Sequence, residues 1–578
     1  MQHGPLLLDD SHTRFHLWAP DAQRVSLLLE NAATLPMQRL ENGWYSLDTE
    51  VGAGTAYRFL IDDELQVPDP AARAQQGDIH GPSLVVDQQA YPWRNQHWRG
   101  RPWHETVLYE LHVGACGGYA QIEQRLAGLA EIGVTAIELM PLAEFPGSRN
   151  WGYDGVLPYA PEASYGSPED LKRLIDAAHS HGLMVILDVV YNHFGPDGNY
   201  LGRYAKHFFR HDQQTPWGDA IDFRQREVRD FFIDSALMWL NEYRFDGLRL
   251  DAVHAITDRG FLTELAERVR GETEPGRHVH LVLENEDNRV SLLEQDFTAQ
   301  WNDDGHNVLH SLLTGESQGY YADFHQDSTA KLVRFLGEGF IYQGQQDRRG
   351  HARGEPSKHL SPTSFVLFLQ NHDQIGNRAF GERLINLAEP EALRAATALL
   401  LLSPMIPMLF MGEEWGAREP FLFFTDHHGE LADAVREGRR GEFAEFAEFA
   451  DEAIRARIPD PNAEATFEAS CPDENKVDEA WAGLYRQLLE IRHREIIPRL
   501  QGATFLDAVA LGDAAALAHW RLGDGSRLRL ELNLGTQPVE LTPAPATARL
   551  LYASREDATS ADSLPPHTAR VLLEDLHE

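Results

Sequence analysis

Four short apolar runs in the chain each end in polar residues that can hold or transfer protons. They lie at residues 184–193, 245–254, 280–287 and 365–373, and each is rich in Val, Ile, Leu or Phe. Runs of this length favour strands that are buried on both faces, as in a parallel sheet. Polar residues at the carboxyl ends of such strands build the active site of a parallel barrel or an open α/β sheet. We therefore expect one shared pocket that contains Asp188, His193, Arg249, Asp251, Glu284, His372 and Asp373.

Three carboxylates of this set suit the cleavage of a glycosidic bond. Asp251, Glu284 and Asp373 could supply a nucleophile, a general acid/base and a stabiliser for a cationic transition state. A retaining glycosidase holds its nucleophile and its acid/base about 5–5.5 Å apart, across the scissile bond. Arg249 precedes Asp251 by two residues, so on a strand both side chains share one face, where the guanidinium would keep the carboxylate ionised. Glu284 has no basic residue after it until Arg289, so the other two carboxylates would raise its pKa.

The sequence also permits structural or metal-binding roles for these side chains. An Asp or His at a strand end can simply accept hydrogen bonds from loop backbone, although seven such residues in this order favour a site. The acidic cluster at 284–287 could bind calcium through its oxygens, but no EF-hand-like spacing surrounds it. Asp188 and His193 could be two zinc ligands, yet no third ligand has a suitable spacing. We expect neither a metal nor a cofactor.

Composition and charge narrow the class of protein. The chain has 578 residues, 43% hydrophobic and 24% charged, which is typical of a globular protein with roughly two to four domains. Its formal net charge of -38 disfavours nucleic acid and anionic membranes as partners, whereas a neutral sugar carries no such penalty.

The cysteines and the apolar segments predict the cellular compartment of the protein. Cys116 and Cys471 are the two cysteines of the chain, which excludes a disulfide framework and favours a reducing cytoplasm. The first residues lack the basic and apolar parts of a signal peptide. The long apolar stretch at 396–411 is interrupted by two prolines and is short for a membrane span. We expect a cytoplasmic protein.

The pattern of short strands and helical stretches predicts a multi-domain α/β protein. Residues 1–90 alternate in short pieces separated by turn residues, which favours an antiparallel β-sandwich, and 91–105 are predicted to be a linker. Eight strand candidates alternate with amphipathic stretches over 106–495, which predicts a (β/α)8 TIM barrel with insertions. A doubly wound sheet is the alternative, although no Gly-rich phosphate loop follows the first strand. Residues 500–578 return to short strands and predict a second, small antiparallel β-domain.

The four blocks resemble the signature regions of the α-amylase superfamily of glycoside hydrolases and transglycosidases. The match includes DVVYNH at 188–193, GLRLDAVH at 247–254 and NHD at 371–373, in the family's order. The resemblance implies that Asp251 is the nucleophile, Glu284 the acid/base and Asp373 the transition-state stabiliser. It also implies substrate-binding or supporting roles for Tyr153, Asp188, His193, Arg249, His254 and His372.

Within this superfamily, the finer sequence resembles the hydrolases that release trehalose. The segments at 138–156, 339–357, 368–384 and 411–443 carry this resemblance. It implies hydrolysis of the α-1,4 bond next to the terminal trehalose of malto-oligosyl-trehalose. The resemblance also implies that related α-1,4-glucans bind. A companion synthase would supply the substrate, and we predict no contact between the two proteins.

Two other functions remain open. A branching or debranching enzyme also carries an N-terminal β-domain, but a branching enzyme usually has Glu after the third acid, whereas Gln374 follows Asp373 here. A catalytically dead barrel that binds carbohydrate is disfavoured because all three acids and Arg249 are present.

Overall fold

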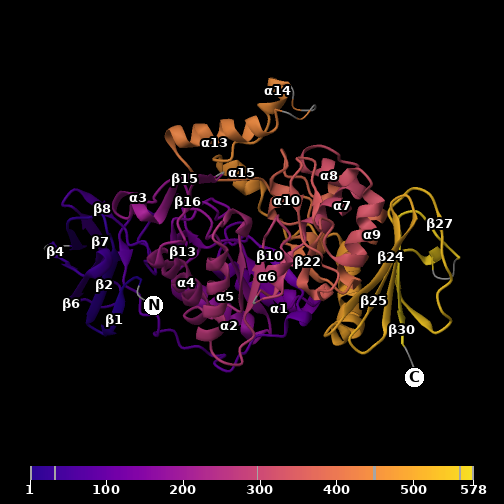
Figure 1. Cartoon of the computed structure of the whole chain (residues 1–578), viewed down its shortest axis with the longest axis horizontal. Coiled ribbons are helices and arrows are strands. Elements are labelled where there is room, and N and C mark those ends of the chain that lie inside the picture. Colours follow the sequence, from indigo (N-terminus) through magenta and orange to yellow (C-terminus); the bar gives the residue numbers. More distant parts are fainter. Residues whose placement is uncertain are drawn as a thin grey trace.

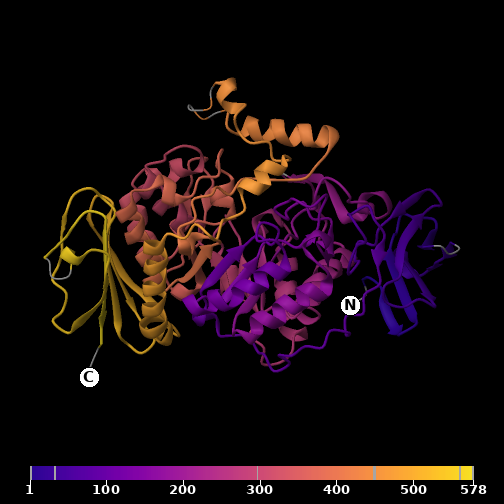
Figure 2. The same ribbon diagram turned by 180° about the vertical axis from the view of Figure 1, so that it is seen from behind.

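The computed structural model of the chain has a barrel flanked by two β-domains. It describes residues 3–30, 34–215, 217–295, 297–444, 446, 449, 451–558 and 562–575. The N-terminal β-domain lies at one end of an elongated molecule, the barrel in the middle and the C-terminal β-domain at the other end (Figure 1). The view from behind shows the same order along the long axis (Figure 2).

The N-terminal domain consists of two antiparallel sheets. One sheet contains, in spatial order, β1 (Leu6–Asp9), β2 (His12–Trp18), β6 (Trp44–Thr49) and β5 (Gln38–Arg39). The other contains β4 (Leu35–Pro36), β3 (Val25–Leu29), β7 (Ala56–Ile61) and β8 (Leu65–Val67), with β9 (Ser83–Leu84) paired to β7. Along β2 buried and partly exposed residues alternate, so Phe15 lies in the core while His16 faces outward. This alternation is why the short runs of this region form a sandwich.

Eight parallel strands close into a barrel, which confirms the predicted fold class. In order they are β10 (Leu108–Leu111), β11 (Ala136–Leu139), β14 (Met184–Val189), β17 (Gly247–Leu250), β18 (His280–Leu283), β19 (Ala299–Trp301), β22 (Phe365–Phe368) and β23 (Ile406–Phe410). Every residue of β10, β11, β17 and β18 is buried, because one face packs inside the barrel and the other against helices.

Helices lie between the barrel strands and after the last of them. The longer ones are α1 (Tyr119–Ile132), α2 (Pro168–Ser180), α4 (Arg226–Asn241), α5 (Arg259–Glu272), α7 (Asp303–Thr314), α9 (Ser328–Glu338), α12 (Pro390–Leu402), α13 (Gly429–Glu442) and α16 (Glu479–Ile491). Ser167 and Asp170 form a reciprocal capping box at the start of α2, with Pro168 in its first turn. Short helices are α3 (Leu201–Tyr204), α6 (Val290–Leu293), α8 (Ala322–His325), α10 (His372–Gly376), α11 (Leu384–Leu387), α14 (Glu452–Arg455) and α15 (Glu464–Ala469).

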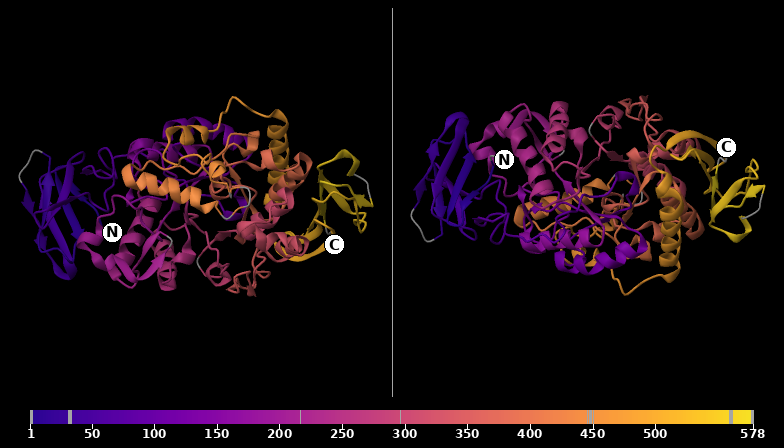
Figure 3. Two further views of the ribbon diagram at one scale, coloured as in Figure 1. Left: turned by 90° about the horizontal axis from the view of Figure 1, so that it is seen from above. Right: turned by 90° about the horizontal axis from the view of Figure 1, so that it is seen from below.

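Segments inserted after the strands cover one side of the barrel. Two-stranded units are β12 (Ala143–Glu144) with β13 (Leu157–Pro161), β15 (Phe209–Thr215) with β16 (Gly218–Ile221), and β20 (Gln345–Gln346) with β21 (Ala352–Arg353). Seen from above, α13 crosses the middle of the molecule (Figure 3). Arg439 of α13 donates a hydrogen bond of 2.7 Å to the carbonyl of Gly376, in the segment that follows β22. This hydrogen bond therefore connects α13 to the segment that follows barrel strand β22.

The C-terminal domain is built on a five-stranded antiparallel sheet. Its spatial order is β24 (Thr504–Gly512), β25 (Ala515–Arg521), β26 (Arg527–Asn533), β30 (Thr568–Glu574) and β28 (Ala548–Ala553), beside the pair β27 (Val539–Glu540) and β29 (Ser563–Leu564). Helix α9 packs on β24 and β25, which joins this sheet to the barrel. In the part of the chain that the structure describes, no helix is both long and apolar enough to span a membrane.

Candidate active site

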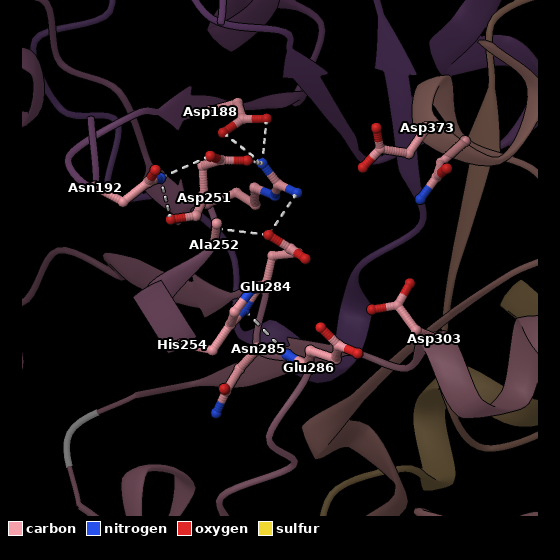
Figure 4. A network of polar contacts seen from close by, with 12 residues as sticks. Asp188, Asn192, Asp251, Ala252, His254, Glu284, Asn285, Glu286, Asp303 and Asp373 are labelled. Carbon is pink, nitrogen blue, oxygen red and sulfur yellow. Dashed lines mark hydrogen bonds and ion pairs between the residues drawn. The ribbon is translucent and has the colours of Figure 1, made fainter. Parts of the chain in front are cut away.

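The side chains of the predicted pocket converge at the carboxyl ends of the barrel strands. Asp188 and Arg249 lie within β14 and β17, while Asp251 and Glu284 follow the ends of β17 and β18. Asp373 enters from α10, directly after β22 (Figure 4). Strands that are far apart in sequence thus place their carboxylates around one centre, as a parallel barrel does.

Arg249 is the centre of this group. It is fully buried, and its Nη1 lies 2.7 Å from Asp188 Oδ2 and 2.8 Å from Asp251 Oδ1. Its Nη2 lies 3.6 Å from Glu284 Oε2, and the guanidinium lies 4.0 Å from the centre of the Trp301 ring. One cation therefore contacts three carboxylates, two of them by direct hydrogen bonds.

The Asp251 carboxylate is held at both oxygens. Arg249 binds Oδ1, while Asn192 Nδ2 donates to Oδ2 at 2.7 Å and to the Asp251 carbonyl at 2.9 Å. Asn192 is itself buried, so its amide has little freedom to turn away. These contacts fix the orientation of the carboxylate predicted as the nucleophile.

Glu284 is oriented by backbone. The N–H of Ala252, which follows Asp251, donates a hydrogen bond of 2.5 Å to Glu284 Oε2. Ala252 has a φ of 41°, a left-handed conformation that turns its N–H toward the site. Among the described residues, the other carboxyl oxygen of Glu284 accepts no protein hydrogen bond that would compete with a proton there.

Burial is the main cause of the raised pKa of Glu284, and Asp251 and Asp373 add to it. Arg249 and His254 act in the opposite direction. The predicted direction is therefore correct, but the predicted cause was incomplete. A basic residue does lie close to Glu284, because Arg249 arrives from the neighbouring strand and not from the sequence around Glu284.

Asp373 is the most open of the three carboxylates, with 41% of its side chain exposed. Asn377 Nδ2 donates to its Oδ1 at 3.2 Å, and His372 Nε2 lies 3.6 Å from the same oxygen. A cavity of about 470 Å³ adjoins this end of the site, and Asn377 and Tyr320 line it. The Asp373 carboxylate is therefore accessible to a ligand in the site.

Tyr153 and His372 pack face to face beside the carboxylates. Their ring centres are 5.1 Å apart with an interplanar angle of 23°. The Tyr153 hydroxyl donates to Asp188 Oδ2 at 2.6 Å. Burial raises the pKa of Asp188 to about 7, against the opposing effect of Arg249. Asp188 thus holds the Tyr153 hydroxyl and the Arg249 guanidinium in position.

The other two predicted histidines have different surroundings. His193 is buried, and its ring nitrogens lie 2.5 Å from Asn192 Oδ1 and 2.9 Å from the Tyr153 carbonyl. Both nitrogens are therefore occupied by protein, so this ring orients the site in the described geometry. His254 is half-buried, and its Nδ1 accepts a hydrogen bond of 3.3 Å from the Glu286 backbone.

Sequence reasoning missed three residues of the site. Asn192 stands beside His193 at the end of the first apolar run, and this position was its signal in the sequence. Asp303, at the start of α7, is a further carboxyl that faces the group (Figure 4). Its pKa is well above the ordinary value, first because of burial and then because of Glu284. Glu110 contacts His372 at 2.5 Å, and a charged residue inside the apolar run 106–114 was the signal that could have revealed it.

The acidic cluster after β18 has its own protein partners. Asp287 pairs with Arg289, and the Asn285 side chain accepts from the Asp287 backbone at 3.2 Å. Over the described ranges, no three His, Cys, Asp or Glu side chains are grouped so that they could hold a metal ion.

Comparisons with known families and proteins agree with this geometry. Residues 3–72 match the family model for carbohydrate-binding module 48 (isoamylase N-terminal domain), and residues 89–219 match the alpha amylase catalytic domain. Residues 503–571 match a domain of unknown function, DUF3459.

The chain is similar to curated proteins over nearly its whole length. It is 40% identical to the malto-oligosyltrehalose trehalohydrolase of Deinococcus radiodurans, over 95% of this chain and 92% of that protein. The trehalohydrolase of Rhizobium sp. strain M-11 is 38% identical, over 97% of both chains. A crystal structure from Salmonella typhimurium, which carries a provisional alpha-amylase name, has a TM-score of 0.93 at 43% identity and covers 99% of each chain.

Proposed function

Because the chain belongs to the malto-oligosyltrehalose trehalohydrolase family, we propose that it cleaves the α-1,4 bond next to the terminal trehalose of malto-oligosyl-trehalose, with Asp251 as the nucleophile and Glu284 as the acid/base. The products would be free trehalose and a shortened malto-oligosaccharide. The observation that carries the residue assignment is the sharing of Arg249 between Asp251 and Glu284.

In the first step, an Asp251 oxygen attacks the anomeric carbon of the glucose on the donor side of the scissile bond. The C1–O bond breaks, and the Glu284 proton goes to the oxygen that leaves with trehalose. Arg249 and Asn192 hold the Asp251 carboxylate in place, which reduces the reorganisation that the attack requires. The raised pKa of Glu284 supports its protonated form at the start of this step.

In the second step, Glu284 accepts a proton from water, which attacks the glycosyl–enzyme and releases Asp251. Asp373 stabilises the positive charge that develops at the sugar ring in both steps. Its exposed carboxylate supports this role, because a sugar ring must reach it. Tyr153 and His372 then contact the donor sugar, and Asp188 and His193 hold these groups in position.

We also propose the nature of the substrate, its source and the compartment. The buried Arg249 and the carboxylates around it suit a neutral α-glucan, and a companion synthase would supply the trehalose-capped end. The two free cysteines support a reducing cytoplasm as the compartment.

Product analysis tests the proposal directly. The purified protein is incubated with a trehalose-capped malto-oligosaccharide, and the products are separated by chromatography. We expect two products, free trehalose and the malto-oligosaccharide that remains after the trehalose is removed. The Asp251→Asn variant should release no trehalose. Altered branch content without free trehalose would overturn the proposal in favour of a branching or debranching enzyme.

A further inference from the structure

Two glutamates lie side by side inside the barrel, below the catalytic carboxylates. Glu110 of β10 and Glu138 of β11 are partners in the parallel register, and each is only 1% exposed. A charged residue in the middle of a barrel strand is costly to bury unless it is paired or neutral. The two residues have the same chemistry and burial, so their different contacts reveal what each one does.

Glu110 holds the histidine that precedes Asp373. Its Oε1 lies 2.5 Å from His372 Nδ1, and its Oε2 accepts from the His372 backbone N–H at 3.0 Å. Both groups of this ion pair are buried to 99%. One carboxylate thus fixes the ring and the backbone at the start of α10, from which Asp373 also projects.

Glu138 has no such partner. Neither of its carboxyl oxygens makes a hydrogen bond with any residue that the structure describes. Burial, followed by the neighbouring Glu110 carboxylate, raises its pKa well above the ordinary value. The charged form of Glu138 is therefore disfavoured, whereas Glu110 forms an ion pair with His372.

We propose that Glu110 is a positioning residue that acts through His372: it keeps the imidazole ring charged and directs its Nε2–H toward Asp373 and the donor sugar. This inference rests on the proposed function, because that function supplies the sugar. A neutral ring with its proton on Nδ1 would offer a lone pair at Nε2, which cannot donate to a hydroxyl or to the Asp373 carboxylate. Glu110 thus makes His372 a donor at both nitrogens.

Electrostatic effects from several elements act on His372. Burial lowers its pKa and so does Arg249, whereas Glu110 and Asp373 raise it, and the result is a pKa of about 9. The charged and titratable groups that face it are Glu110, His112, Glu138, Tyr153, Arg249 and Asp373. Without the Glu110 carboxylate, burial and Arg249 oppose Asp373 alone, so we expect the pKa of His372 to fall.

The two glutamates provide a matched pair of variants. Glu110→Gln removes the charge next to His372, whereas Glu138→Gln replaces a neutral carboxyl with an amide at the neighbouring position. For Glu110→Gln we expect kcat/KM on the trehalose-capped substrate to fall by roughly 10- to 100-fold at pH 7.5, the effect of losing a hydrogen bond from a charged donor. The loss should shrink at pH 5.5, where the imidazole is protonated again. Glu138→Gln should keep wild-type activity at both pH values.

A titration of the histidine rings by NMR, with His372 assigned through a His372→Asn variant, measures the proposed cause directly. We expect His372 to titrate near 9 in the wild type and in Glu138→Gln, and at a clearly lower pH in Glu110→Gln. Glu110→Asp keeps the charge and should keep His372 charged at pH 7.5, which decides the matter if Glu110→Gln does not fold.

Two outcomes would overturn the role of Glu110. One is an unchanged His372 titration in Glu110→Gln or a loss of the His372 charge in Glu110→Asp, and the other is an equal, pH-independent loss of activity in Glu110→Gln and Glu138→Gln. A wild-type protein that released no trehalose would instead overturn the proposed function, and the His372 titration would still decide how Glu110 acts.

Discussion

The backbone N–H of Ala252 donates a 2.5 Å hydrogen bond to the carboxylate of Glu284. Since Ala252 directly follows Asp251, the proposed acid/base is attached to the backbone that carries the proposed nucleophile. The spacing of the two carboxylates therefore depends on the left-handed turn at Ala252 and less on flexible side chains.

Replacement of the proposed nucleophile, Asp251→Asn, should lower kcat by several orders of magnitude. The amide has nearly the shape of the carboxylate but cannot form the glycosyl–enzyme. We expect the circular dichroism spectrum and the affinity for substrate to be largely retained, because Arg249 keeps its second partner, Asp188. Near-wild-type turnover in this variant would show that another residue is the nucleophile.

The acid and the stabiliser can be told apart by the leaving group. Glu284→Gln should nearly abolish cleavage of the natural glucan bond, whose leaving oxygen needs a proton. With an aryl or fluoride glycoside, the glycosylation step should be much less impaired, since such a leaving group needs little protonation.

Asp373→Asn is the matched control for that comparison. It should slow glycosylation of both substrates by a similar factor, because charge at the sugar ring develops whatever the leaving group is. An equal loss on both substrates in Glu284→Gln, measured for glycosylation alone, would contradict the assignment of Glu284 as the acid.

Removal of divalent metals should leave activity unchanged. The oxygens of Glu284 and Asp287 are bound by the Ala252 N–H and by Arg289, so the cluster after β18 is engaged within the protein. Turnover is measured after dialysis against EDTA, and again after Ca²⁺ is added. If EDTA stopped the reaction and Ca²⁺ restored it, a metal site would have to be added to this account.

Glu414 should make the folded protein less stable as the pH rises. It lies in the turn after β23, and burial raises its pKa from 4.5 to about 8. The folded state thus binds this proton more tightly than the unfolded state does, so this contribution to stability is lost as the pH rises from about 4.5 to about 8. Glu414→Gln keeps a neutral side chain, and its gain in the free energy of unfolding should grow over that interval and level off above it.

Urea unfolding of wild type and variant at pH 5, 7 and 9 would measure this effect. Glu294→Gln is a suitable control, because its carboxylate is half exposed and pairs with His359 at the surface. A stability difference between wild type and Glu414→Gln that did not change with pH would contradict the expectation.

Much of the fold could be predicted from the sequence because its signals are local. The run that contains Asp188 is apolar without interruption, and only a strand covered on both faces suits such a run. Ser167 and Asp170 likewise mark the start of α2 through contacts within one turn. The order of the acids along the chain then placed Asp251, Glu284 and Asp373 at strand ends, where the structure has them.

The electrostatics of the site were decided by the tertiary structure alone. The contact of Arg249 with Glu284 and that of Glu110 with His372 join residues that lie on one strand and after another, 35 and 262 positions apart. A pKa depends on burial and on charges within a few ångströms, and neither quantity can be calculated from spacing in the sequence. The sequence by itself therefore determined which acids stand at the strand ends, whereas only the closed barrel decided which cation, amide or carboxylate each of them contacts.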